Sequence, residues 1–182
     1  MEHRKNFLYP RLRISISQPH RSQLLLDHNP TLTGRLILQD RPEVVSELSN
    51  LPPRIEPLIH SYFEPQPPNL HNARIYHLRQ ILHNNTHTDC IRILKALLPS
   101  MGPDSVLMVD EKVMPDKSKS VDDDRAVQVA QASMAMLAFF NTVERRRDQW
   151  EGLLEEGGYR VVEVKKYADT HDSIIVARKK EE

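Results

Sequence analysis

Short apolar runs alternate along the chain with amphipathic segments, and the two kinds of segment have the lengths of strands and helices. The apolar runs predict strands over residues 35–39, 55–59, 73–78, 105–111, 159–167 and 173–178. The segments with helical spacing predict helices over residues 43–49, 81–83, 89–98, 125–140 and 146–156. This alternation predicts an α/β fold in which a mainly parallel sheet carries helices on both faces.

Turn-forming residues mark the ends of these elements. Pro42 suits the first turn of a helix, and Gly157-Gly158 ends the last helix. The last two strands are joined only by the short segment 169–172. Because so short a connection joins antiparallel neighbours, we expect a C-terminal antiparallel hairpin.

The N-terminal part of the chain has the weakest pattern. Residues 12–17 alternate like a short strand, and little else there is periodic. We therefore divide the chain into a divergent N-terminal segment, residues 1–33, and one domain, residues 34–182. The full length of 182 residues is enough for a single domain with its own core.

Charge and cysteine content exclude several classes of protein. The chain has 25 basic and 25 acidic residues, so it has no overall positive field that would attract nucleic acid. Cys90 is the only cysteine, which excludes an intrachain disulfide and indicates a reducing compartment. No apolar run approaches the roughly 20 residues that span a bilayer. We expect a soluble, cytoplasmic protein without a membrane or nucleic-acid partner.

Asp40 is the first candidate for chemistry, because it follows the first predicted strand of the domain. An acid at the carboxyl end of an early strand can accept hydrogen bonds from ribose hydroxyls. The same residue could instead cap the helix that begins near Pro42, and the local sequence leaves both explanations open. The chain has only five glycines, and none of them forms a glycine-rich phosphate loop.

His83 and two glutamates form the second group of candidates. His83 follows the strand 73–78, near the sheet edge where open α/β proteins bind ligands, and an imidazole can act as a general base. Glu111 ends a buried strand and Glu144 lies between two helices; a carboxylate beside a histidine fixes its tautomer. Taken singly, each is more often structural or a surface charge, and the basic run 145–147 is typical of a solvated turn. The histidine spacing matches no zinc pattern, so no metal is expected.

A series of short motifs then follows in a fixed order. Their positions are 34–45 (GRLILQDRPEVV), 54–57 (RIEP), 60–63 (HSYF), 65–67 (PQP), 76–83 (YHLRQILH), 91–95 (IRILK), 101–105 (MGPDS), 109–115 (VDEKVMP) and 144–145 (ER). Together they resemble the fungal S-adenosylmethionine-dependent O-methyltransferases, relatives of the plant caffeic-acid and flavonoid enzymes. The resemblance covers about residues 19–178. It implies a Rossmann-like class I methyltransferase sheet, incomplete at its N-terminal end, with residues 34–182 as the catalytic domain.

The resemblance also implies how the methyl donor, S-adenosylmethionine, is bound. Asp40 matches the acid that binds the ribose of the donor. Arg79 matches a basic position, usually lysine, near the donor. Ser61 stands where the family has an acid that helps to hold the adenosine, and Tyr62 follows it.

The resemblance assigns catalysis to the second group of candidates. His83 matches the base that takes the proton from a phenolic or enolic hydroxyl. Glu111 and Glu144 match the carboxylates that flank and orient that histidine. The acceptor would be a small aromatic or polyketide-type molecule, and the family requires no metal.

Several departures from the family leave other functions open. The glycine loop falls at residues 15–19, which here read Ser-Ile-Ser-Gln-Pro, and the usual Asp-Trp after the histidine is Asn84-Asn85. The family's helical N-terminal region has no counterpart in the sequence, so apolar residues near Leu137 would be exposed and would favour homo- or hetero-oligomers. The alternatives are a degenerate pseudo-methyltransferase or partner subunit, and a methyltransferase fold that catalyses a rearrangement or cyclisation.

The altered loop at residues 15–19 predicts weak binding of the donor. A donor-site loop contributes several backbone hydrogen bonds, each worth about 0.5–1.5 kcal/mol, and roughly 1.4 kcal/mol changes an affinity tenfold. We expect calorimetric titration of this chain with S-adenosylmethionine to give a dissociation constant well above the micromolar range. A micromolar value would contradict this prediction.

Overall fold

The structure is a computed structural model, and it describes residues 25–114, 131, 133, 134, 136–138, 142, 144–168 and 171–181. The predicted strand 12–17 and the glycine-loop position 15–19 lie outside the described residues, as does most of the predicted helix 125–140. In the described part of that helix, Met134 and Leu137 are 70% and 56% exposed. None of the helices in the described ranges is both long and apolar enough to cross a bilayer.

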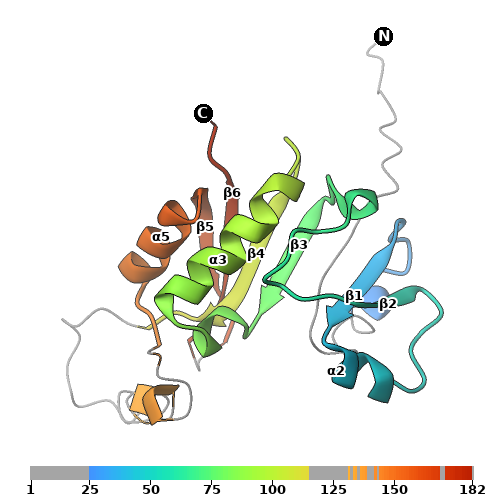
Figure 1. The fold of residues 1–182 in the computed structure, drawn as a ribbon, viewed down its shortest axis with the longest axis horizontal. Helices are drawn as coiled ribbons and strands as arrows, with labels where there is room; N and C mark the ends of the chain where they lie inside the picture. Colours follow the sequence, from blue (N-terminus) through green and yellow to red (C-terminus); the bar gives the residue numbers. More distant parts are fainter. Residues whose placement is uncertain are drawn as a thin grey trace.

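The strands form two sheets (Figure 1). The smaller sheet pairs β1 (Leu36–Asp40) with β2 (Ile55–Ile59), and the larger one has the order β3 (Ile75–Arg79), β4 (Val106–Lys112), β6 (Asp172–Lys179) and β5 (Tyr159–Lys166). The helices include α2 (Pro42–Glu47), α3 (His87–Leu97) and α5 (Arg147–Glu156), with 3₁₀ turns η1 (Pro68–Leu70), η2 (Leu82–Asn84) and η3 (Leu98–Ser100).

The pairing confirms the predicted mixture of parallel and antiparallel strands. β1 is parallel to β2, and β3 is parallel to β4. β6 is antiparallel to both β4 and β5, so three of the four strands of the larger sheet run in one direction. The C-terminal hairpin is therefore present, and its second strand lies inside the sheet, between β4 and β5.

Each sheet has its own apolar cluster. The main core lies between the larger sheet and the helices α3 and α5, which lie side by side over one face of it (Figure 1). The alternation of β4 supplies Leu107 and Val109 to this core, and α3 supplies Ile93 and Leu94. A second, smaller cluster packs Leu36 and its neighbours of β1 and β2 and includes the partly buried Ile75 of β3.

The chain leaves β3 through a residue with an uncommon backbone conformation. Gln80 follows β3 directly and has φ of 50°, in the left-handed region that non-glycine residues seldom adopt. Its N–H donates to the carbonyl of Asp110 in β4 at 3.0 Å. The chain therefore leaves the sheet at a sharp, fixed angle and enters η2, which carries His83.

The close contact between α3 and the end of α5 gives a test of the core. A Cβ atom at Gly157 would lie 2.7 Å and 2.8 Å from side-chain atoms of Leu94, whereas one at Gly152 meets nothing within 4 Å. We expect Gly157→Ala to lower the free energy of unfolding by about 1–3 kcal/mol through overpacking. Gly152→Ala, within the same helix, should raise it by about 0.5–1 kcal/mol. Denaturant titration of both variants measures this, and equal effects would contradict the assigned packing.

Candidate active site

A buried glutamate organises the turn that carries the histidine. Glu111 lies in β4 and is 1% exposed. Its Oε1 accepts hydrogen bonds from the backbone N–H groups of Ile81 at 2.9 Å, Leu82 at 2.9 Å and His83 at 3.4 Å. These are N–H groups at the start of a short helical turn, which lack partners within the turn itself. The carboxylate therefore fixes η2 to the middle of the sheet.

The three catalytic candidates lie together. His83 Nδ1 is 3.4 Å from Glu144 Oε1 and 3.9 Å from Glu111 Oε2. The His83 side chain is 13% exposed, and those of Glu111 and Glu144 are 0% and 2% exposed. Because a carboxylate can only accept a hydrogen bond, Nδ1 carries the proton, and Nε2 is left as the basic nitrogen.

The surroundings adjust the proton affinity of this group. Burial alone lowers the pKa of His83, but the hydrogen bond to Glu144 and the two negative charges outweigh burial and raise it above its ordinary value. Burial raises the pKa of Glu111 to about 7, although the charge of His83 and the Leu82 N–H offset part of this effect. The Oε2 atoms of Glu111 and Glu144 are buried and accept no hydrogen bond from the residues that the structure describes. The arrangement can take up and release a proton near neutral pH.

The backbone of the histidine turn is held from a second direction. Thr142 Oγ1 donates to the His83 carbonyl at 2.6 Å, and Arg145 donates to the Leu82 and Asn85 carbonyls at 3.1 Å and 3.3 Å. Arg145 is buried, and its guanidinium lies 5.0 Å from the centre of the Trp150 ring. The prediction of a solvated basic turn is therefore wrong for Arg145, because the turn's carbonyl groups require buried donors.

Other polar groups complete the same turn. The amides of Asn84 and Asn85 donate to the carbonyls of Gln80 and Ile81 at 3.1 Å and 2.7 Å. The Cys90 thiol is 3.1 Å from the Leu82 carbonyl, and burial raises its pKa to about 11. Burial outweighs the nearby Arg145 guanidinium, which lowers this pKa, so Cys90 stays a neutral thiol.

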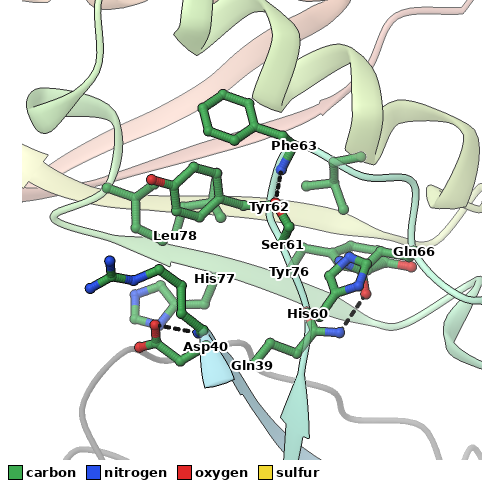
Figure 2. Close-up of a pocket in the computed structure, with 13 residues that line it drawn as sticks. Gln39, Asp40, His60, Ser61, Tyr62, Phe63, Gln66, Tyr76, His77 and Leu78 are labelled. Carbon is green, nitrogen blue, oxygen red and sulfur yellow. Dashed lines mark hydrogen bonds between the residues drawn. The ribbon is translucent and has the colours of Figure 1, made fainter. Parts of the chain in front are cut away.

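A cavity of about 160 Å³ lies at the carboxyl ends of β1 and β2, beside β3. Its lining includes Asp40, Ser61, Tyr62, His77 and Ile81. Figure 2 shows Asp40 and His77 at one end of the lining residues and Phe63 at the other. The cavity thus adjoins the turn that carries His83, because Ile81 lies two positions before it in the chain.

The structure tests one of the two explanations of Asp40, the capping of α2. The N-cap residue of α2 is Arg41, and no side chain caps that helix. Asp40 Oδ1 accepts a local bond, from the Arg41 N–H at 2.8 Å (Figure 2). The helix-capping explanation is therefore wrong, and the carboxylate lines the cavity.

The remaining cavity residues differ in how firmly they are held. Ser61 Oγ accepts from the Phe63 N–H at 3.3 Å, and the rings of Tyr62 and Phe63 are 4.8 Å apart. His60 Nε2 is buried without a hydrogen bond. The sequence alone indicated no role for His60 and His77 beyond their place in the motifs 60–63 and 76–83, and their position beside Asp40 became visible only in three dimensions. No cluster of three or more His, Cys, Asp or Glu side chains within the described segments could bind a metal.

Arg79 is the one predicted site residue that joins neither group. Its guanidinium donates to Asp110 and, at 3.0 Å, to the Tyr167 hydroxyl, which itself donates to Asp110 at 2.7 Å. Burial alone raises the pKa of Asp110. The His77 imidazole, 3.6 Å from the carboxylate, and the hydrogen bonds from Tyr167 and Arg79 outweigh burial and hold that pKa below its ordinary value. Arg79 is not among the cavity-lining residues. It ties β3 to β4 and to the end of β5.

Comparison with known proteins places this chain in a family. The model of the O-methyltransferase domain matches residues 28–160. The chain therefore belongs to the O-methyltransferase domain family.

Among its relatives are enzymes named for defined methylations. The chain is 37% identical to the demethylsterigmatocystin 6-O-methyltransferase of Aspergillus flavus over 150 residues, which are 81% of this chain and 36% of the relative. It is 34% identical to the O-methyltransferase UcdC of Aspergillus ustus over 161 residues, which are 88% of this chain and 40% of that one. The chain thus spans well under half of the length of these two relatives.

Solved structures agree on the fold. The complex of LepI with SAM superposes with a TM-score of 0.82 at 24% identity, over 96% of this chain and 44% of that one. The mitomycin 7-O-methyltransferase MmcR gives 0.78 at 24% identity, over 94% and 49%. At this level of identity the likeness establishes the shared fold alone.

The contact between His83 and Glu144 is open to a direct test. In Glu144→Gln we expect the pKa of His83 to fall, because the acceptor loses the charge that stabilises the imidazolium. The raised pKa means that protonated His83 stabilises the folded state, and this contribution is lost as the pH rises through that pKa. The difference in the free energy of unfolding between the wild type and Glu144→Gln should therefore become smaller as the pH rises above the pKa of His83.

Imidazole-resolved NMR titration and denaturant unfolding at several pH values measure both effects. Glu151→Gln is the matched control, since Glu151 is on the surface and pairs with Arg147. An unchanged His83 titration in Glu144→Gln would contradict the assigned contact.

Proposed function

We propose that this chain is the catalytic part of an S-adenosylmethionine-dependent O-methyltransferase of fungal secondary metabolism. The observation that carries the proposal is the contact of His83 Nδ1 with the buried Glu144, which leaves Nε2 as the basic nitrogen. An imidazole oriented in this way is a general base for a hydroxyl group. The acceptor is a phenolic or enolic hydroxyl on a small aromatic or polyketide-type molecule.

The chain's own residues account for the proton in this reaction. His83 Nε2 takes the proton of the acceptor hydroxyl, and the imidazolium that forms lies between Glu111 and Glu144. Their negative charges stabilise it without a further proton transfer. S-adenosylmethionine supplies, when bound, a methyl group on a positively charged sulfur that an oxygen nucleophile can attack. The network at Glu111 excludes water from the inner side of the histidine.

The cavity beside β3 suits the nucleoside portion of that donor. Asp40 offers a carboxylate to ribose hydroxyls, as acids at the carboxyl ends of such strands do. Tyr62 offers a ring face, Ser61 a small polar group, and Leu78 an apolar wall. Arg79 acts on the donor site indirectly. It holds the carboxyl end of β3 against Asp110, which also lies beside the cavity-lining His77.

Two other functions are less well supported. A degenerate protein would have no need for two buried carboxylates around one histidine, since each costs free energy to desolvate. A rearrangement catalyst is supported only by a likeness of fold. The structural neighbour described as a pericyclic reaction enzyme is 24% identical to this chain, which is too low to carry over its activity. The relatives with higher identity are named as O-methyltransferases.

Removal of the base tests the proposal. We expect His83→Ala to reduce the rate of methyl transfer by about 10²–10⁴-fold, the range contributed by a positioned general base. The assay measures methylated product by mass spectrometry, with a panel of phenolic polyketides and a saturating donor concentration.

The control for this variant is His87→Ala. His87 is exposed and pairs with Glu156 on the surface, so its removal should leave transfer unchanged. Circular dichroism establishes that both variants fold. Transfer by folded His83→Ala at the wild-type rate would exclude His83 as the base.

A further inference from the structure

The turn that carries His83 presents its carbonyl groups to one buried segment. The carbonyl oxygens of Leu82, His83 and Asn85 accept hydrogen bonds from the side chains of Thr142 and Arg145. The adjoining Glu144 holds the imidazole of the same histidine. One short stretch of chain therefore fixes both the ring and the backbone of His83.

Arg145 is suited to this position by its shape. Its planar fork places Nη1 on the Leu82 carbonyl at 3.1 Å and Nη2 on the Asn85 carbonyl at 3.3 Å, with the Cys90 sulfur 3.5 Å from Nη2. A lysine has a single nitrogen and cannot span two carbonyl groups in this way. The guanidinium is buried and also stacks on Trp150.

The segment itself is anchored to the sheet. The N–H of Met114, just beyond the end of β4, donates to the Arg145 carbonyl at 3.0 Å, and Met114 and Arg146 form an isolated parallel bridge. The Trp150 indole donates to the Lys112 carbonyl at 3.0 Å. Arg145 thus links the end of β4 to the carbonyl groups of the histidine turn. Glu111 of the same strand binds the N–H groups of that turn, on its other side.

We propose that Arg145 is a positioning residue for His83, which holds the backbone of the turn so that the imidazole stays against Glu144. Its catalytic consequence rests on the function proposed above, but its effect on the histidine itself does not. Arg145 touches none of the reacting atoms. It acts on the histidine turn through its hydrogen bonds to the Leu82 and Asn85 carbonyls.

The experiment compares three substitutions with one control. Arg145→Met keeps an unbranched but shorter side chain and leaves both carbonyls without their donor, while Arg145→Lys restores one donor nitrogen. Thr142→Val removes only the bond to the His83 carbonyl. Arg147→Met changes an exposed arginine of the same basic run that pairs with Glu151.

The first measurement is the titration of the His83 imidazole by NMR. In Arg145→Met the contact with Glu144 loosens, and the pKa of His83 should fall by about 1 pH unit. Arg145→Lys and Thr142→Val should move it less, in the same direction, and Arg147→Met should leave it unchanged. A residue that only stabilised the fold would lower the melting temperature and leave this titration as it is.

The second measurement separates kcat from KM. We expect Arg145→Met to lower kcat by about 10- to 100-fold, as small displacements of a reacting group do, with the KM for the donor unchanged and partial recovery in Arg145→Lys. If Arg145→Met does not fold, Arg145→Lys and Thr142→Val decide the question. An unaltered His83 titration in folded Arg145 and Thr142 variants would overturn the proposal. If the wild type transfers no methyl group, the proposed function fails, whereas the titration still decides the role of Arg145.

Discussion

The buried carboxylate of Glu111 is the interaction on which the site depends. It lies inside β4, on the face that packs against the helices, where an unsatisfied charge is costly. Three backbone N–H groups of the turn after β3 satisfy one of its oxygens. The other oxygen faces the His83 ring. A strand in the middle of the sheet thereby dictates where the histidine stands, although 28 positions separate the two residues in the chain.

The same turn is held from its other side by a segment distant in sequence. N–H groups of the turn point to β4, and its carbonyl groups point to Thr142 and Arg145. Between these two sets of bonds the turn has little freedom, which allows Gln80 to keep its left-handed conformation at the end of β3. Such rigidity favours a base that must meet a hydroxyl at a defined distance.

The sequence predicted the elements better than the contacts between them. Hydrophobic periodicity located every strand of the described ranges to within a few residues, and strand-end position singled out Asp40, His83 and Glu111. Glu144 was a candidate as an acid between two helices, and only the resemblance assigned it to His83, because no local pattern shows that a loop residue approaches a histidine 61 positions earlier. Arg145 was misjudged, since a run of arginines gives no sign that one of them is buried. Arg79 was assigned to the neighbourhood of the donor by the resemblance, and its hydrogen bonds to Asp110 and Tyr167 could not be foreseen because those residues are 31 and 88 positions away in the chain.

The separation of the apolar interior into two clusters affects how the molecule opens. β1 and β2 pack around Leu36 and Leu38, apart from the core beneath α3 and α5, and the cavity lies where these two parts meet. Units with separate interiors can open independently and exchange their amide hydrogens at different rates. A small molecule that touched Asp40 on one wall and Leu78 on the other would join the two units. Binding in the cavity would then slow the exchange of the amide hydrogens of β1 and β2, far from the chemistry at His83.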